Sequence, residues 1–258
     1  MIVGNKIVYL NDSSKFSDEI LSELIKIDNS FISVIISYRY RNKKTDESYI
    51  SYIKYKLMRA IKNSFQLKKA ISFYRVGKRY KVLNGGKVNS DKLIKVLTKI
   101  NPDYIMICGG GVLSDEIINI PYRGIINVHP GILPYARGLD VLYHSIINKY
   151  PIGVTAHFID QGIDTGDIIL RKLVNIEKND SFKEIKSKLN HTHINLYLEI
   201  FKKILSKDLF DRFKQKEKFK YCNKITKKEK QLALDILGQS SFLEEYLIAL
   251  KKYKFSNE

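Results

Sequence analysis

Two β-rich runs flank a helical pattern near the start of the chain, and they constrain the fold more than any other feature. Residues 6–10 (KIVYL) form a short run of strand-forming residues, and residues 31–37 (FISVIIS) lack the alternation expected of a strand with one face in water. Between them, residues 16–27 place apolar side chains at helical spacing. Strand, helix and strand in this order predict a parallel sheet with helices on both faces.

Further segments continue the same pattern. We predict a helix capped by Ser90 that runs to Ile100, and a long helix over residues 181–204. More strands are predicted at residues 80–83, 104–108, 124–128, 152–159 and 168–174. The lysine-rich tail contains two further helical patterns, at residues 231–237 and 242–253. The prediction is therefore an α/β fold with a Rossmann-like, mostly parallel sheet, divided into a catalytic domain of residues 1–205 and a helical C-terminal extension of residues 206–258.

The charge balance is strongly basic. Lys and Arg number 45 against 27 Asp and Glu, which gives a net charge of +18. Such a protein attracts anions, although much of the charge can equally be a solvated surface. Cys108 and Cys222 lie far apart, and no apolar run is long enough to span a membrane. With no secretory pattern at the N-terminus, we expect a cytoplasmic protein that does not bind membranes.

Two polar side chains mark the end of the strand predicted at residues 124–128. Asn127 and His129 are two residues apart, so their side chains leave the same face of an extended chain. The carboxyl ends of parallel strands are where open α/β sheets bind ligands. Pro130 follows directly, and a stiff loop of prolines and glycines extends to Gly138. By itself this pattern equally fits a buried Asn and a hydrogen-bonded His.

Two glycine-containing turns accompany this strand end. Residues 160–167 (DQGIDTGD) follow the strand predicted at 152–159 and contain Asp164 between two glycines. Their spacing does not fit a calcium loop. Residues 109–111 are three glycines after a buried strand, where the backbone can approach a planar ligand. They do not match the dinucleotide-binding fingerprint.

Together these segments resemble the family of formyltransferases that use 10-formyltetrahydrofolate. The likeness is carried by NVHPGILPYARG at residues 127–138 and by GVTAHFIDQGIDTGDII at residues 153–169. Their order and spacing follow the family pattern of Asn-x-His-Pro, then Leu-Pro and Gly, then an Asp within Gly-x-Asp-x-Gly. The likeness is strong over residues 104–170 and faint after residue 206. It implies the formyltransferase fold and an N-formyltransferase.

The resemblance also implies roles for particular residues. Asn127 and His129 would donate hydrogen bonds to the oxyanion of a tetrahedral intermediate, while Asp164 would accept the proton of the attacking amine. The family uses 10-formyltetrahydrofolate as co-substrate and needs no metal. Backbone groups of two loops would line the pterin pocket, and we predict as cofactor-binding residues Gly110, Gly111, Val112, Leu113, Asp160, Gln161 and Gly162. Tyr135 and Arg137 are the predicted substrate contacts.

The loop at residues 129–140 is most similar to the branch of the family that formylates nucleotide-linked amino sugars. We therefore predict a dTDP-linked 3- or 4-amino-dideoxyhexose as acceptor, in O-antigen or related lipopolysaccharide synthesis. The glycine-rich loop expected of a glycinamide ribonucleotide enzyme is missing from residues 10–14. Methionyl-tRNA is the alternative acceptor, and tRNA would then be the nucleic acid bound. A basic, non-enzymatic nucleic-acid-binding protein would not explain the three site residues. The oligomeric state, a homodimer included, is left open.

Other histidines are interpreted as packing residues. His157 lies inside a predicted strand, which favours a place in the core. His191 and His193 are two apart on a predicted helix and point to different faces, so they are not expected to share a metal. The basic, aromatic stretch at residues 38–44 could stack a base, or could equally be a solvated loop.

Overall fold

The computed structural model describes residues 6–12, 14–27, 32–38, 81–109, 111–216 and 219–253, with only the backbone of residues 32–38, 81 and 82. The chain forms two compact units. The first comprises Met1–Ile126 with Ile204–Lys207, and the second comprises Asn127–Lys203 with Asp208–Glu258. The tail thus belongs to the same unit as residues 127–203, and a domain boundary at residue 205 stays a prediction. Residues 39–44 of the basic stretch and Gly110 lie outside the described residues.

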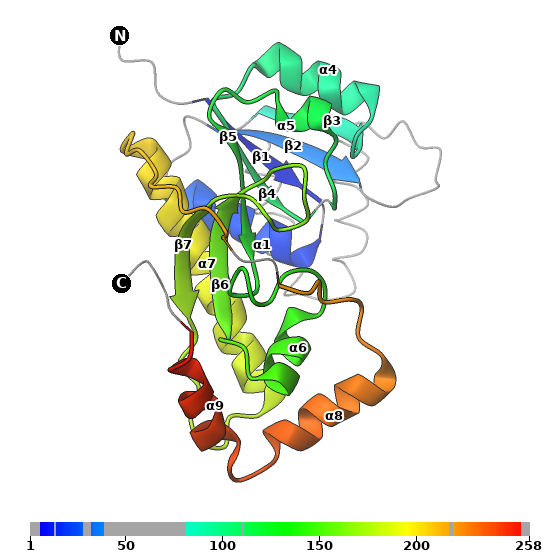
Figure 1. The fold of residues 1–258 in the computed structure, drawn as a ribbon. Helices are drawn as coiled ribbons and strands as arrows, with labels where there is room; N and C mark the ends of the chain where they lie inside the picture. The colour runs from blue at the N-terminus through cyan, green and yellow to red at the C-terminus, as the bar shows by residue number, and fades with distance from the viewer. Residues whose placement is uncertain are drawn as a thin grey trace, which may run out of the picture. The chain divides into compact units, whose positions relative to one another are not determined.

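The first unit contains the predicted strand–helix–strand opening. Strand β1 (Ile7–Asn11) is fully buried and pairs in parallel with β2 (Ile32–Tyr38) on one side and β4 (Tyr104–Cys108) on the other. Helix α1 (Lys15–Ile27) buries the apolar stripe of Ile20, Leu21 and Leu24 that its spacing predicted. The strand order in this unit is β3-β2-β1-β4, as Figure 1 shows.

Strand β3 (Lys81–Lys87) differs from its prediction. The sequence suggested that the strand stops before Asn84-Gly85-Gly86, but the strand continues through them. A register shift between Ile36 and Ser37 of β2 leaves Gly85 unpaired, so a bulge accommodates the glycines within the strand. The next helix, α4 (Asp91–Ile100), begins as predicted, because the Ser90 side chain accepts a hydrogen bond from the Leu93 amide.

The second unit contains the end of β5 and the strands and helices that follow it. The strand order is β5-β6-β7, and β6 and β7 are antiparallel. Strand β6 is buried at every position, including Thr155 and His157, whose polar atoms are all hydrogen-bonded. The elements of the second unit are β5 (Gly124–His129, which begins in the first unit), α6 (Val141–Asn148), β6 (Gly153–Phe158), β7 (Ile168–Leu173) and α7 (Phe182–Leu205).

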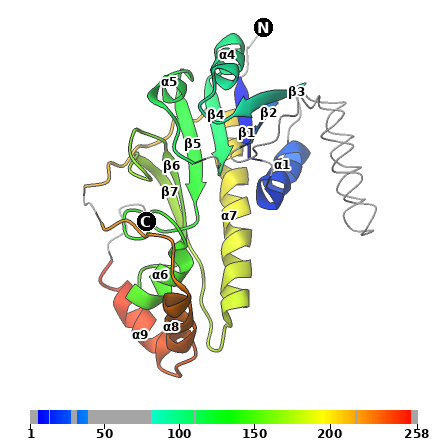
Figure 2. The same cartoon turned by 90° about the vertical axis from the view of Figure 1, so that its right-hand side faces the viewer.

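The tail of the second unit is helical, as predicted. Helix α8 (Lys227–Leu237) begins at a capping box between Thr226 and Glu229, and α9 (Phe242–Leu250) follows it. Both helices lie near α6, as Figure 2 shows. The fold is α/β, with a mostly parallel sheet and surrounding helices. Among the described helices, none combines the length and apolar character that crossing a membrane requires.

Candidate active site

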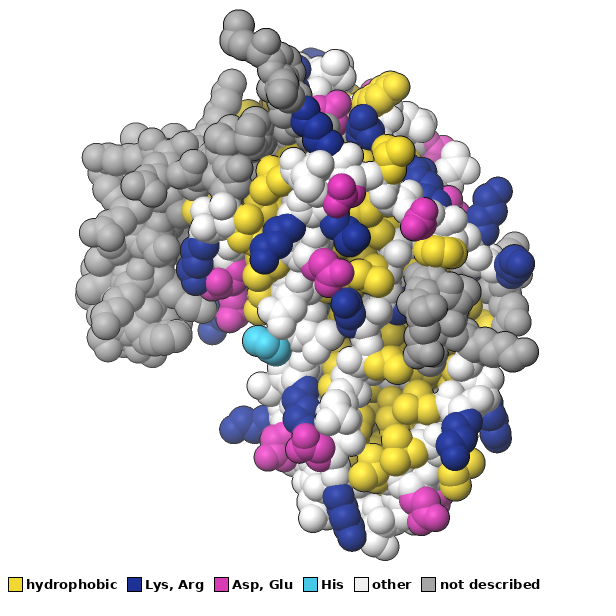
Figure 3. Space-filling model, turned by 90° about the vertical axis from the view of Figure 1, so that its left-hand side faces the viewer, with side chains coloured by type: hydrophobic (Ala, Val, Ile, Leu, Met, Phe, Trp, Pro, Cys, Tyr) yellow, Lys and Arg dark blue, Asp and Glu magenta, His cyan; other side chains and the backbone are white. Residues whose placement is uncertain are grey.

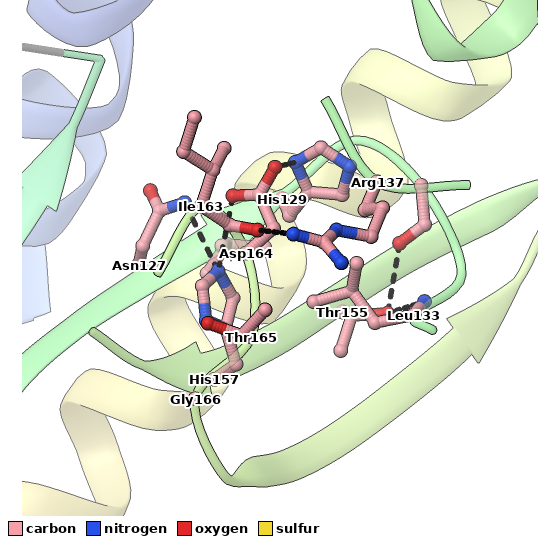
Figure 4. A network of polar contacts seen from close by, with 12 residues as sticks. Asn127, His129, Leu133, Arg137, Thr155, His157, Ile163, Asp164, Thr165 and Gly166 are labelled. Atoms are coloured by element: carbon pink, nitrogen blue, oxygen red, sulfur yellow. Dashed lines mark hydrogen bonds and ion pairs between the residues drawn. The ribbon is translucent and has the colours of Figure 1, made fainter. Parts of the chain in front are cut away.

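The end of β5 holds His129 in one orientation. Its ring is buried, and Nε2 lies 2.7 Å from the Ala136 carbonyl oxygen. A carbonyl only accepts hydrogen bonds, so Nε2 carries a proton and donates it. The other ring nitrogen, Nδ1, lies 3.6 Å from Oδ2 of Asp164 (Figure 4). The two residues that the sequence placed in one catalytic centre are therefore neighbours.

Asp164 reaches this position from the loop between β6 and β7. Its backbone is left-handed, with φ 54°, a conformation in which Asp is one of the few tolerated side chains. Its Oδ2 accepts a hydrogen bond of 2.9 Å from the Gly138 amide. Its Oδ1 faces Nε2 of His157 at 3.8 Å. One carboxylate thus joins the loop after β6 to the loop after β5.

His157 links Asp164 to Asn127. Its Nδ1 lies 2.8 Å from its neighbour's carbonyl oxygen, that of Phe158, and therefore donates to it. Burial lowers the pKa of His157 to about 4, so the ring is neutral near pH 7 and Nε2 carries a lone pair. That lone pair accepts a hydrogen bond from Nδ2 of Asn127, 3.3 Å away. The predicted packing role of His157 is therefore incomplete, since this buried ring also contacts two of the site residues.

Helix α7 fixes the same strand end from its own buried face. The Tyr197 hydroxyl accepts a hydrogen bond from the Val128 amide at 3.3 Å and donates to Oδ1 of Asn127 at 3.4 Å. His193 lies one turn earlier, stacks on the Tyr197 ring and donates from Nε2 to the Val128 carbonyl at 2.7 Å. These bonds place the Asn127 amide nitrogen toward His157 and its oxygen toward Tyr197. Sequence reasoning missed both helix residues, although polar side chains four apart on a buried helix face are a usable signal.

The two predicted substrate contacts make protein contacts in the structure. Arg137 donates from Nη2 to the Ile163 carbonyl at 2.9 Å, which ties its loop to that of Asp164. The Tyr135 ring packs edge-on against Phe219 and Tyr253, with ring centroids 4.7 and 4.6 Å away. Their roles in substrate binding stay predictions.

The predicted cofactor-binding residues lie in two separate loops. Asp160 shapes the first, because its Oδ1 accepts hydrogen bonds from the Gly162 amide at 3.0 Å and the Thr165 hydroxyl at 2.6 Å. Gln161 and Gly162 are exposed there. The second loop follows β4 in the first unit and contains the predicted residues Gly111, the exposed Val112 and the buried Leu113. That the two loops line one pterin pocket stays a prediction. Within the described ranges, no group of three or more His, Cys, Asp or Glu could hold a metal ion.

The comparison with known families agrees with this geometry. Residues 6–201, most of the chain, match the family model described as formyl transferase. The chain belongs to the formyl transferase family. Among its curated relatives in that family, the methionyl-tRNA formyltransferase of Caldicellulosiruptor saccharolyticus is 34% identical over 149 residues, which are 57% of this chain and 47% of that protein. The chain spans about half the length of the curated relatives it matches.

Solved structures of formyltransferases share the fold. A 4-N formyltransferase from Francisella tularensis matches with a TM-score of 0.59 at 21% identity, covering 90% of this chain and 87% of that one. The formyltransferase PseJ from Anoxybacillus kamchatkensis, crystallised with UDP-4,6-dideoxy-4-formamido-L-AltNAc and tetrahydrofolate, matches with a TM-score of 0.53 at 22% identity and covers 93% of this chain and 96% of its own. These likenesses show the formyltransferase fold that the sequence predicted.

Proposed function

We propose that the protein transfers a formyl group from 10-formyltetrahydrofolate to the amine of a nucleotide-linked amino sugar. The observation that carries the proposal is the joint geometry of Asn127, His129 and Asp164. An amide and an imidazole leave one strand end, and a carboxylate from a separate loop lies 3.6 Å from the imidazole. This arrangement combines hydrogen-bond donors with a proton acceptor, which formyl transfer to an amine requires.

The hydrogen bonds of His129 define how it can act. Because Nε2 donates to the Ala136 carbonyl, Nδ1 is the nitrogen that can meet the formyl oxygen. Donation from Nδ1 requires a proton on that nitrogen as well as on Nε2, and Oδ2 of Asp164 lies 3.6 Å from Nδ1. Asn127 contributes a second donor, because one Nδ2 hydrogen bonds His157 and the other is left for the oxyanion.

In the proposed reaction, the formyl carbon exchanges its bond to the folate nitrogen N10 for a bond to the acceptor amine. The acceptor amine attacks the formyl carbon, the carbonyl electrons move to oxygen, and Asn127 and His129 donate hydrogen bonds to the resulting oxyanion. Asp164 accepts the proton that the amine loses, directly or through water. The bond from the formyl carbon to N10 of the folate then breaks, and N10 takes up a proton. The products are tetrahydrofolate and a formamide.

The folate donor is supported by the family and by the chemistry of two loops. PseJ, which shares the fold, was crystallised with tetrahydrofolate. In this chain the turn at residues 160–162 is shaped by its own Asp160 carboxylate, and Gln161 and Gly162 are exposed there. We assign the pterin to this turn and to residues 110–113, through backbone groups.

The amino-sugar acceptor is supported by the extent of the structural likeness. Formyltransferases named for 4-N or sugar substrates match this chain over about 90% of its length. A basic protein also suits a dianionic diphosphate. We therefore propose a dTDP-linked 3- or 4-amino-dideoxyhexose, with a product used in O-antigen or related lipopolysaccharide synthesis.

Methionyl-tRNA is the second candidate acceptor. The curated methionyl-tRNA formyltransferases are more similar in sequence, at 34% identity, than the sugar enzymes of known structure. The net charge of +18 also suits tRNA. Against this candidate, the face drawn in Figure 3 shows Lys and Arg scattered among acidic side chains rather than gathered in one patch.

One assay distinguishes these candidates. The protein is incubated with 10-formyltetrahydrofolate and, separately, with dTDP- and UDP-linked amino sugars, methionyl-tRNA and glycinamide ribonucleotide. Tetrahydrofolate formation and product mass are then recorded. We expect turnover with an amino-sugar nucleotide. Turnover with methionyl-tRNA alone would replace the proposed acceptor, and no turnover with any amine would exclude the proposed activity.

A further inference from the structure

The side chain of Gln215, a residue of the tail, contacts two backbone carbonyl groups of the Asp164 loop. Its Nε2 donates to the Asp164 carbonyl at 3.1 Å and to the Gly166 carbonyl at 2.8 Å. The side-chain amide has two hydrogens, so both bonds can form at once. Asp164 has a left-handed backbone, a conformation that few side chains adopt without support from their surroundings. Gln215 supplies such support from 51 residues away in the sequence.

The chain around Gln215 is anchored independently of that side chain. Phe213 and Ile168 exchange two backbone hydrogen bonds of 2.9 Å, so the tail adds an antiparallel bridge at the start of β7. The guanidinium of Arg212 lies 3.8 Å from the centre of the Phe158 ring. Loss of the Gln215 amide alone should therefore leave the segment in place.

The same stretch of tail also contacts the other site loop. Cys222 donates from its amide to the Arg137 carbonyl and accepts from the Leu139 amide, both at 2.8 Å. These bonds hold the backbone on either side of Gly138, whose own amide donates to the Asp164 carboxylate. A side chain at Gly138 would meet the Tyr221 ring at 2.6 Å, so the two segments touch closely here. The tail thus contacts both partners of the bond that orients Asp164.

We propose that Gln215 is a positioning residue for Asp164, and that the tail residues 212–215 and 221–222 brace the catalytic loops. The inference rests on the proposed function, because it assigns Asp164 as the proton acceptor. Within the described part of the chain, the Gln215 amide bonds backbone carbonyls of the Asp164 loop, and we therefore infer that it acts through Asp164. Its loss should lower kcat while leaving the Michaelis constants for both substrates nearly unchanged.

The test uses the full-length chain with two substitutions at one position. Gln215→Met keeps the size of the side chain and removes the donor, while Gln215→Glu places a carboxylate against two carbonyl oxygens. We expect kcat to fall about 10-fold for Met and about 100-fold for Glu, the range that a small misplacement of a reacting group produces. Gln231→Met is the matched control, because the exposed Gln231 bonds Asp235 one turn later on α8. It should leave kcat unchanged.

The Glu variant has a signature that a general loss of structure lacks. When its carboxyl is protonated it can again donate one hydrogen bond, so kcat of Gln215→Glu relative to Gln215→Met should rise as the pH falls. A pH-independent ratio, or a kcat within twofold of wild type for Gln215→Met, would overturn the proposal.

A second readout does not depend on activity. The Gly138 amide is protected by its bond to Asp164, so its hydrogen exchange, measured by NMR, should accelerate in Gln215→Met and stay unchanged in Gln231→Met. If Gly138 exchanges faster in Gln215→Met but the wild-type protein formylates no amine, the bracing role of Gln215 is supported and the proposed function is rejected. Unchanged exchange in an active enzyme would reject the brace alone.

Discussion

The proposed catalytic centre is assembled from two regions that are held in different ways. At the end of β5, Asn127 and His129 are fixed by buried side chains of β6 and α7 and by the nearby Ala136 carbonyl. In the loop after β6, Asp164 has a left-handed backbone and is held by Gly138 and by the tail residue Gln215. The strand end is thus part of the core, and the loop depends on bonds from distant segments.

In the proposed formyl transfer, the strand end would donate hydrogen bonds to the oxyanion, and the loop would accept the proton of the amine. Donors to an oxyanion work best when they are preorganised and cost no rearrangement, which suits the buried strand end. A proton acceptor has to meet an amine that arrives and leaves, and a loop braced at its backbone can do so without disturbing the donors. Changes at the strand end and in the loop should therefore fail in different ways.

The largest effect is expected for the carboxylate of the loop. Asp164→Asn keeps an oxygen that can accept from Gly138 but removes the proton acceptor, so kcat should fall about 1,000-fold with little change in melting temperature. Asp167→Asn is the matched control in the same loop and should retain kcat within a few-fold. The role of Asp164 as proton acceptor is wrong if Asp164→Asn keeps a tenth of the wild-type rate.

At the strand end, the largest effect should come from His129. In His129→Gln the amide can still donate to the Ala136 carbonyl, but the proposed oxyanion donor at Nδ1 is lost, so kcat should fall about 100-fold. His144→Gln is the control, because His144 bonds the Asn223 carbonyl at the surface and should not affect kcat. Equal losses in the two variants would contradict the assignment of His129 as the oxyanion donor.

Acid should weaken the strand end through its buried histidines. Burial lowers the pKa of His193 to about 4, against about 6.5 in an unfolded chain. Between these values the unfolded state binds a proton that the folded state does not, so the free energy of unfolding falls as the pH falls. His193 should account for about 2 kcal/mol between pH 7 and pH 4.5.

Urea unfolding at the two pH values, with variants of α7, tests this dependence. His193→Gln should remove that part of the pH dependence, and the exposed His191→Gln should keep it. His157, whose pKa burial also lowers to about 4, should contribute in the same direction and remain in the His193 variant. An unchanged slope in His193→Gln would show that the pKa of His193 is the same in the folded and unfolded states, which would contradict the lowering by burial.

The two regions were also unequally predictable from the sequence. The strand end was predictable because its signals are local: a continuous apolar run ends at Asn127 and His129, and extended geometry puts both side chains on one face. The long helix α7 followed from its periodicity for the same reason. The family resemblance then added Asp164, which lies 3.6 Å from His129 in the structure, while its catalytic role stays a prediction.

The contacts that hold the loop could not be predicted in this way. Gln215 lies in a lysine-rich tail, and nothing in its neighbours indicates that its amide meets a loop 49 residues earlier. His157 was interpreted as a core residue because a buried strand explains it fully, yet burial and a site contact coexist in one ring. The end of β3 was misplaced because a bulge absorbs glycines that otherwise signal a turn.

The smallest effect on catalysis should come from the orientation of the Asn127 amide. His157 accepts from its nitrogen and Tyr197 donates to its oxygen, so each partner opposes a flip that would turn the oxygen toward the oxyanion. Tyr197→Phe removes one of these bonds, and His157→Phe removes the other. Each should lower kcat about 10-fold, which corresponds to about 1.4 kcal/mol of lost transition-state stabilisation.

A double-mutant cycle separates this effect from general damage. If His157 and Tyr197 act by orienting Asn127, neither substitution should lower kcat further once Asn127 is replaced by alanine, because no amide remains to be oriented. If the losses add fully to that of Asn127→Ala, the two residues act on something other than the amide. Gly138 exchange should stay unchanged in Tyr197→Phe, because the Tyr197 hydroxyl bonds Val128 and Asn127 at the strand end. His157 also faces Oδ1 of Asp164 at 3.8 Å, so Tyr197→Phe is the variant that keeps the strand end and the loop experimentally distinct.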